Sequence, residues 1–503
     1  MHLLTLPTNI PWLSLIWLSM LLPTVIIALV PAGRKELMRW VGTGFALLSL
    51  VLTLLVFFGY DQGRGGFQFV ERLDWVPQLG ISYLLGVDGI SLAMLLLNGV
   101  VIFCGALMSW NIETRVKEYW VLLLLLTLGV YGVFVALDLF LFFVFYELAV
   151  LPMYVLIGVW GSTRKEYGAM KLTLYLMAGS ALVLVGMLAI YFGSGLRTFD
   201  MLALARNVTL SREFQQIFFP PLFVGFAVLA GMVPFHTWSP TGHVAAPTAV
   251  SMLHAGVLMK LGAYGCLRVA WGLRPRGARD WLWLVAIITL LNVVYGAAIA
   301  MAQRDFKYMI GYSSVSHMGL VLMGLAAGDQ IGITGAVLQM FAHGVMTALF
   351  FAVVGRMVYD RTHTRQLPEL GGLARVMPFA AVMFAVAGLS SMGMPGLAGF
   401  WAELNIFIGL WNSYPLVAII AAIAIPITAA YILRALYQVF FGELSNPAFA
   451  SLPRLTWQEY TGALVLALIL VGVGIYPAII TELISGGVTG VVQNLNEAGL
   501  AGR

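Results

Sequence analysis

The sequence has 503 residues, of which 61% are hydrophobic and only 10% charged, with a mean hydropathy of +0.94. So little polar surface excludes a soluble globule of this length and predicts one all-α polytopic membrane domain over residues 1–503. The net charge of +5 is spread over the loops, which excludes a nucleic-acid partner and leaves the lipid bilayer.

Apolar runs of about 17 to 25 residues recur along the whole chain and predict about 14 transmembrane helices. The expected spans are 10–30, 40–59, 83–109, 119–137, 139–160, 169–193, 218–236, 247–271, 281–301, 306–327, 333–358, 377–410, 414–440 and 459–480. The first run lacks a basic leader and a cleavage site, so we expect a retained helix rather than a signal peptide. An even number of crossings places both termini on one side.

Basic residues favour the loops after the odd-numbered spans, with about thirteen there against about eight in the opposite loops. The first group includes Arg34, Lys35, Arg39, Arg164, Lys165, Arg361, Arg365 and Arg375; the second includes Arg64, Arg72, Arg197, Arg206, Arg212, Arg274, Arg276 and Arg279. Because basic loops stay in the cytoplasm, this bias predicts that both termini lie on the non-cytoplasmic side.

Two spans are interrupted in the same manner. The letters FAV at Phe226 precede Pro234 and Pro240, and FAV at Phe384 precedes the breaker 393–396. Five spans separate the two, which suggests a repeated five-helix unit, as in transporters that place broken helices at a midplane site. The repeats would be spans 4–8 (111–275) and 9–13 (276–440), after N-terminal helices 1–3 (1–110) and before C-terminal helix 14 (441–503). Ordinary Pro and Gly content of membrane helices is the alternative.

Ionisable residues well inside the spans are few, and each belongs to a different helix. They are Glu147, Lys260, His317, His343 and Glu403. A series of acids, a base and histidines is what a proton relay requires, since each carrier must exchange a proton with the next. The alternatives are a static buried ion pair or a snorkelling side chain for the three charged residues, and a neutral histidine bonded to the helix backbone for the other two.

Further polar residues have simpler interpretations. His236, His243 and His254 lie in or near the first interruption, where bonding to freed backbone groups is as reasonable as an accessory transport role. Asp88 and Asp138 stand at helix starts and are expected to be caps. Arg304, Asp305 and Lys307 are expected in a short cytoplasmic turn that sets orientation. Cys104 and Cys266 lie in separate apolar helices and are expected to pack. No catalytic triad, metal-ligand spacing or phosphate loop is present, so we expect no metal or cofactor in this chain.

Eight stretches together resemble the antiporter-like, proton-translocating subunits of respiratory complex I, the subunit M type in particular, and the related Mrp-type cation/proton antiporters. They are LGVDGIS at Leu85, YELAVLPMYVLIG at Tyr146, PFHTW at Pro234, APT at Ala246, AGVLMKLGAYG at Ala255, YSSVSHMG at Tyr312, QMFAH at Gln339 and MPGLAGFWAE at Met394. The resemblance covers nearly the whole chain. Fourteen spans without a long C-terminal lateral helix also resemble subunit M rather than subunit L.

The resemblance implies roles for the five carriers. Glu147 would be the acid of the input half, Lys260 the connecting lysine, His317 the central relay, His343 a secondary relay and Glu403 the terminal acid. It also implies a bacterial inner (plasma) membrane location and partner membrane subunits, including the homologous subunits L and N. FMN, iron–sulfur clusters and quinone would belong to partner subunits.

The sequence departs from the resembled pattern at the input half. A lysine is expected in the seventh helix, paired with the glutamate of the fifth, but Leu229 stands at that position. Gly231 replaces a proline, Thr241 an aspartate, and Ala402 a glycine. These departures leave the fold intact and question whether the input half works in the standard way.

Four functions remain open on the sequence. One is a proton-translocating subunit of a complex I-type NAD(P)H- or ferredoxin-quinone oxidoreductase, with no redox centre of its own. Another is an Mrp-type sodium/proton antiporter subunit. A haem-binding or quinone-reactive enzyme is a weaker third, because no helix carries the repeated histidines typical of stacked haems. The last is a pump-derived scaffold with an impaired input channel.

Overall fold

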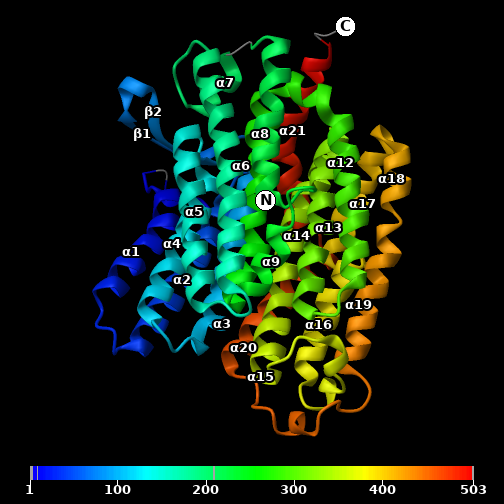
Figure 1. The fold of residues 1–503 in the computed structure, drawn as a ribbon. Coiled ribbons are helices and arrows are strands. Elements are labelled where there is room, and N and C mark those ends of the chain that lie inside the picture. The colour runs from blue at the N-terminus through cyan, green and yellow to red at the C-terminus, as the bar shows by residue number, and fades with distance from the viewer. Residues whose placement is uncertain (1–3, 8, 208–209, 501–503) are drawn as a thin grey trace.

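The computed structural model describes residues 4–7, 9–207 and 210–500. Its long helices stand side by side as one bundle (Figure 1). The hairpin β1–β2, the short helix α7 and the C-terminal end lie at one end, which we call the hairpin face; α15 and the loop 441–456 lie at the other, the α15 face.

The elements follow one another in the order expected of a polytopic membrane protein. They are α1 (Trp12–Leu29), α2 (Lys35–Gly59), β1 (Gln68–Val76), β2 (Ile81–Val87), α3 (Gly89–Met108), α4 (Val116–Val135), α5 (Leu139–Trp160), α6 (Lys165–Gly193), α7 (Met201–Asn207), α8 (Arg212–Ala230), α9 (Trp238–Ala245), α10 (Thr248–Leu253), α11 (Met259–Gly265), α12 (Pro275–Ala302), α13 (Phe306–Ala327), α14 (Gln330–Phe351), α15 (Asp360–Thr362), α16 (Pro378–Ser391), α17 (Ala398–Ser413), α18 (Pro415–Ala421), α19 (Ala424–Phe440), α20 (Trp457–Ile475) and α21 (Ala478–Leu500).

The expectation of an all-α membrane protein is confirmed, since the described residues contain 14 helices that are long and apolar enough to cross a membrane. The 14 spans differ from the 14 expected ones in one member. The expected span 377–410 consists of the two shorter helices α16 and α17, and the helix Ala478–Glu497 completes the number instead.

The third expected span, 83–109, begins too early. Residues Ile81–Val87 form strand β2, which pairs antiparallel with β1, and helix α3 starts only at Gly89. The residues before Asp88 are as apolar as those of α3, so hydropathy alone assigned the strand and the helix to one span. Asp88 separates the two elements, because its carboxylate accepts hydrogen bonds from the Ile90 and Ser91 amides at the helix start. Asp138 caps α5 in the same manner, so both expected caps are confirmed.

The hairpin is fixed to the helical bundle. The Glu71 carboxylate accepts hydrogen bonds from the Leu13 amide at 2.7 Å and from the Ser14 amide at 3.2 Å, which satisfies free donors at the start of α1. Arg72 forms an ion pair with Asp200 at 3.1 Å, next to α7. The hairpin therefore joins the first helix to the connection between α6 and α8.

The C-terminal region 441–503, expected to hold one helix, holds two. Helix α20 ends before Pro477, and α21 follows. Its contacts are with the first residues of other helices: Ser485 accepts a hydrogen bond from Gln330 at the start of α14, and the Leu495 carbonyl accepts one from Arg279 at the start of α12. Helix α21 therefore lies against the helix ends at the hairpin face (Figure 1).

Both expected interruptions are present. Helix α8 ends at Ala230, the following Gly231 has a left-handed φ of 78°, and α9 begins only at Trp238. The buried Asn292 of α12 supports this break: its amide donates to the Gly231 and Val315 carbonyls at 3.1 Å each, and its oxygen accepts from the Val233 amide. The second break separates α16 from α17, with Gly393 and Gly396 at positive φ.

Burial separates an inner group of helices from an outer one. Residues 249–267 and 332–355 are wholly buried, and α13 nearly so, whereas α1, α2, α6 and α19 expose apolar side chains. An apolar outer surface suits lipid contact. The inner helices carry Lys260, His317 and His343.

Loops that follow the odd-numbered spans meet at the α15 face. Lys35 contacts Glu113 at 3.1 Å, Asn111 contacts Asp360 at 3.1 Å, and Arg365 donates to Thr163 at 3.2 Å. The basic-rich loops of the sequence are therefore neighbours on one face.

Candidate functional site

Lys260 lies fully buried in the helical span Thr248–Trp271. Its ammonium group donates to the Ala255 carbonyl and to Nδ1 of His343 on α14, the latter at 2.8 Å. Because an ammonium group only donates, Nδ1 of His343 accepts. The Ala255 carbonyl lies in a π-helical segment, His254–Leu258, where the ordinary helical bonding pattern shifts.

His343 lies against His317 of α13. The two rings are stacked, with centroids 5.3 Å apart and planes inclined by 18°. Both side chains are almost wholly buried. With Nδ1 of His343 accepting from Lys260, its remaining proton is on Nε2, which bonds to no atom of the described chain. This N–H is available to donate to a water molecule or to a side chain that moves toward it.

His317 is placed between two backbone carbonyls. Its Nδ1 lies 2.8 Å from the Ser313 carbonyl and its Nε2 3.2 Å from the Ser391 carbonyl. Since carbonyl oxygens only accept, both bonds form together only when both ring nitrogens carry a proton. The hydroxyl groups of Ser313 and Ser391 lie 3.4 Å from the same two nitrogens and can donate to a nitrogen that has lost its proton. The pocket therefore accommodates both the neutral and the imidazolium form of His317.

Glu403 completes a row of four groups. Its Oε1 lies 3.7 Å from Nε2 of His317, and the side chain is 8% exposed. A cavity of about 10 Å³ borders both residues, close to the smallest space that holds a water molecule. The order Lys260, His343, His317, Glu403 thus links four helices through neighbouring groups.

The second break in the helices positions this row. Ser391 is the last residue of α16, where carbonyl groups lack partners within the helix, so its oxygen is free to accept from His317. Gly393 lies beside Glu403, and a Cβ atom there would come within 2.7 Å of Glu403 Oε2. The Gly-rich interruption therefore supplies both an acceptor and space for the carboxyl group.

Glu147 lies apart from this row. It is half-buried on α5, its Oε1 has no hydrogen-bond partner, and it forms no ion pair with any residue that the structure describes. Leu229, at the position of the expected lysine, is fully buried. The structure thus joins four of the five predicted carriers and leaves the fifth without a cation.

His254 and His243 form a second cluster at the first break. Their rings contact at a centroid distance of 4.0 Å, and His254 also stacks on Trp238 at 5.2 Å. Nε2 of His243 lies 3.1 Å from Ser239 Oγ. Rings in direct contact leave no space for a haem between them, which argues against the haem hypothesis.

His236 is separate from both groups. It lies in the turn between α8 and α9, edge-on to Tyr295 and near Tyr312. Within the described ranges, no group of three or more His, Cys, Asp or Glu residues is placed to hold a metal ion.

Sequence reasoning missed several buried polar residues. Lys307, expected in a short cytoplasmic turn, is only 2% exposed; its ammonium donates to the Ala246 carbonyl at 3.4 Å and lies over the Tyr359 ring. Arg268 forms a buried ion pair with Asp88. Both cations lie near helix ends in the sequence, where lysine and arginine are usually solvated, so only packing reveals their burial.

The fold and the buried row define a class of protein. Broken and π-bulged membrane helices that carry adjacent acids, histidines and a lysine are typical of ion and proton transporters. Residues 136–428, more than half of the chain, match the family model described as "NADH:quinone oxidoreductase/Mrp antiporter, TM". The chain belongs to this family.

Named relatives agree with this membership. The chain is 38% identical to the NADH-quinone oxidoreductase subunit M of Rhodobacter capsulatus, over 92% of each chain. It is 39% identical to an NAD(P)H-quinone oxidoreductase chain 4 of Microcystis aeruginosa, over 88% of this chain and 81% of the relative. A chain in the structure of respiratory complex I from Thermus thermophilus with bound NADH superimposes with a TM-score of 0.87 at 29% identity, covering 95% of this chain and 99% of that one.

Proposed function

We propose that the chain is an antiporter-like membrane subunit of a complex I-type NAD(P)H- or ferredoxin-quinone oxidoreductase, and that it translocates protons driven by electron transfer elsewhere in the complex. The similarity to subunits of NADH-quinone and NAD(P)H-quinone oxidoreductases supports the choice of parent complex. The buried row from Lys260 to Glu403 supports proton translocation as the mechanism. FMN, iron–sulfur clusters and quinone belong to partner subunits.

The single observation that carries the transport proposal is the continuity of the row. Lys260 contacts His343 at 2.8 Å, His343 stacks on His317, and His317 faces Glu403 at 3.7 Å. Three neighbouring proton carriers and a terminal acid reach across the bundle interior, where an isolated charge costs several kcal/mol. In this mechanism a proton leaves Lys260 for the histidines, His317 holds it between two carbonyls, and Glu403 receives it.

The proposed membrane orientation and neighbouring subunits follow from the relatives and from the uneven distribution of basic residues among the loops. The α15 face is cytoplasmic, both termini lie on the non-cytoplasmic side of a bacterial inner membrane, and homologous subunits of the L and N type flank the chain. The basic-rich loops gathered on the α15 face support this orientation.

An Mrp-type sodium/proton antiporter subunit is the second candidate, because the matched family model includes those proteins. Purification of the native chain with its partners, followed by measurement of protons moved per electron in vesicles, tests the first proposal. Co-purifying flavin and iron–sulfur subunits with sodium-independent pumping support it. Sodium-dependent exchange without redox partners supports the antiporter, and normal pumping in Lys260→Ala supports a scaffold.

A further inference from the structure

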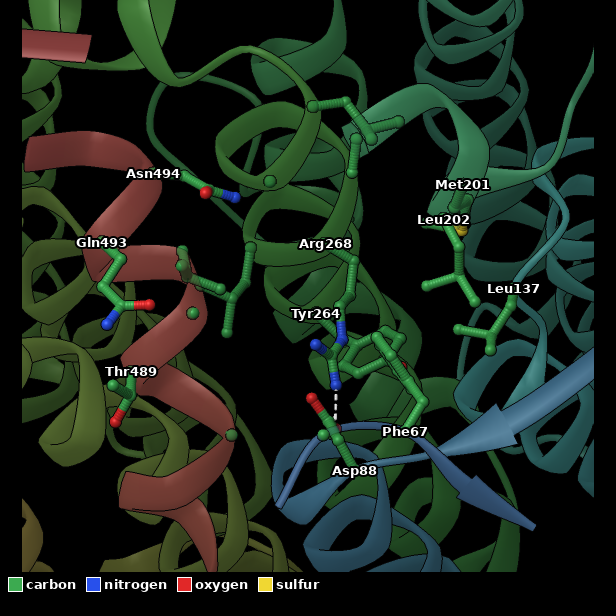
Figure 2. Close-up of a pocket in the computed structure, with 18 of the residues that line it drawn as sticks. Phe67, Asp88, Leu137, Met201, Leu202, Tyr264, Arg268, Thr489, Gln493 and Asn494 are labelled. Atoms are coloured by element: carbon green, nitrogen blue, oxygen red, sulfur yellow. Dashed lines mark hydrogen bonds and ion pairs between the residues drawn. The ribbon is translucent and has the colours of Figure 1, made fainter. Parts of the chain in front are cut away.

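A cavity of about 430 Å³ lies at the hairpin face, away from the relay row. Figure 2 shows α21 on one side of it and Leu202 of α7 with Leu137 on the other. Asp88 and Arg268 lie between these two sides, joined by an ion pair. The volume is enough for about fourteen water molecules at roughly 30 Å³ each.

The charges in this cavity compensate each other. Asp88 accepts from the Ile90 amide at 3.1 Å, from the Ser91 amide at 3.0 Å and from the Arg268 guanidinium. The Arg268 guanidinium also donates to Ser91 Oγ at 3.0 Å. A carboxylate and a guanidinium engaged in this way leave no net charge to attract an ionic ligand.

The α21 side of the cavity is polar. Thr489, Gln493 and Asn494 line it, and the amide groups of Gln493 and Asn494 form no hydrogen bonds to the part of the chain that is described. Amide groups that line a cavity need hydrogen-bonding partners. Water supplies them, and an acyl chain does not.

Tyr264 lines the cavity and bonds to buried groups behind it. Its hydroxyl group donates to the Phe134 carbonyl at 3.1 Å and lies 2.8 Å from the Oγ of Ser91, a buried residue that does not line the cavity. Tyr264 follows Lys260 by one helical turn, so the two side chains share a helix face. A hydroxyl group both donates and accepts, which allows it to pass a proton by releasing its own.

We propose that this cavity is a water-filled vestibule through which Lys260 exchanges protons with the hairpin face, by way of Tyr264, which Ser91 positions. The Lys260 side chain turns from His343 toward Tyr264. One N–H bond of the ammonium then breaks as its proton binds Tyr264 Oη. Tyr264 lines the cavity, so the proton that it held passes directly to a vestibule water, which becomes hydronium, while Ser91 Oγ keeps Tyr264 Oη in place. The Tyr264 hydroxyl group is restored and Lys260 is left neutral.

This route rests on the proposed proton translocation and adds a branch that requires neither Glu147 nor Glu403. Gly490 offers a direct test, because a Cβ atom at this position of α21 would meet no other atom within 4 Å. A charged, membrane-impermeant thiol reagent should modify Gly490→Cys from the hairpin face. The native Cys104 and Cys266 are buried and should not react.

The matched control is Gly33→Cys, in an exposed loop of the opposite face, where an added Cβ atom also meets nothing within 4 Å. In the assembled complex, modification of Gly490→Cys should lower the protons moved per electron by half or more. Modification of Gly33→Cys should leave the ratio unchanged. If Gly490→Cys is not modified, or is modified without effect on the ratio, the vestibule proposal is wrong.

The hydroxyl pair has its own test. Tyr264→Phe and Ser91→Ala should lower the proton-to-electron ratio while electron transfer continues, whereas Tyr131→Phe, which removes another buried hydroxyl paired with Ser49 at 3.1 Å, should not. If the proton-to-electron ratio falls in Lys260→Ala but stays normal in the Tyr264 and Ser91 variants, the vestibule proposal is wrong and the proposed function stands. A normal ratio in Lys260→Ala overturns the proposed function itself. If Tyr264→Phe fails to assemble, the Gly490→Cys result decides.

Discussion

Lys260 donates a hydrogen bond of 2.8 Å to Nδ1 of His343, although 83 residues separate them in the sequence. This contact joins the one fully buried lysine of the span Thr248–Trp271 to the histidine row that leads to Glu403. It also fixes the proton of neutral His343 on Nε2. Loss of either partner leaves the other buried without its bond.

Removal of Lys260 should therefore uncouple the subunit. We expect Lys260→Ala to leave the complex assembled and to slow proton transfer through this chain by about 100-fold or more, since no apolar neighbour can carry a proton. Glu403→Gln should act in the same direction at the other end of the row. Protons moved per electron in vesicles, measured with the amount of assembled complex, check both. Normal ratios in both variants would contradict the relay.

His317 should respond to substitution according to its two carbonyl contacts. His317→Gln keeps a donor nitrogen, in its amide group, but cannot carry a positive charge, so we expect assembly with reduced proton transfer. The control is His236→Gln, since His236 lies outside the row and contacts Tyr295 instead. Equal losses of proton transfer in the two variants would show that the row has no special role.

Glu147 should keep its proton at neutral pH. Partial burial in the helix bundle disfavours the charged form of a carboxylate that has no cation beside it, and Leu229 supplies no charge. Infrared difference spectroscopy should show a protonated-carboxyl band that Glu147→Gln lacks and that Leu229→Lys removes by restoring an ion pair. An ionised carboxylate at Glu147 in the wild type would show that another cation reaches it.

Asn292 should contribute to stability through the first helix break. Its amide joins the Gly231 and Val315 carbonyls, so Asn292→Leu leaves buried backbone groups without partners, each costing about 1–3 kcal/mol. Asn98 is the matched control: it is equally buried, and its amide bonds to no described residue, so Asn98→Leu should cost little. Thermal unfolding of the purified complex compares them, and equal effects would contradict the assigned role of Asn292.

The loop carboxylate Glu113 should make stability depend on pH at the α15 face. Hydrogen bonds from Arg39 at 2.5 Å and Lys35 at 3.1 Å lower the pKa of Glu113 below its usual value. A lowered pKa stabilises the fold above the unfolded value of about 4.3, and the contribution is lost as the pH falls through the folded pKa. Glu113→Gln should lower stability by at most about 1 kcal/mol at pH 7, with the difference vanishing in acid. A difference that persists in acid would exclude this pair as its cause.

The sequence by itself determined the membrane class, the positions of most helices, both helix breaks and the five ionisable residues of the helical interior. These features are local: an apolar run, a Gly-Pro interruption or a charge within an apolar run is visible without knowing the neighbours. The caps Asp88 and Asp138 were predictable for the same reason, because an N-cap acts on amides two or three residues away.

Only the tertiary structure decided which of these residues meet. His317 and Glu403 lie 86 positions apart, and their contact depends on how α13 packs against α17. Hydropathy cannot decide this, because lipid-facing and inward-facing surfaces of a membrane helix are both apolar. The burial of Lys307, the Arg268–Asp88 pair, the isolation of Glu147 and the position of α21 across the helix ends depend on the same packing. Each results from three-dimensional neighbours that no single apolar run specifies.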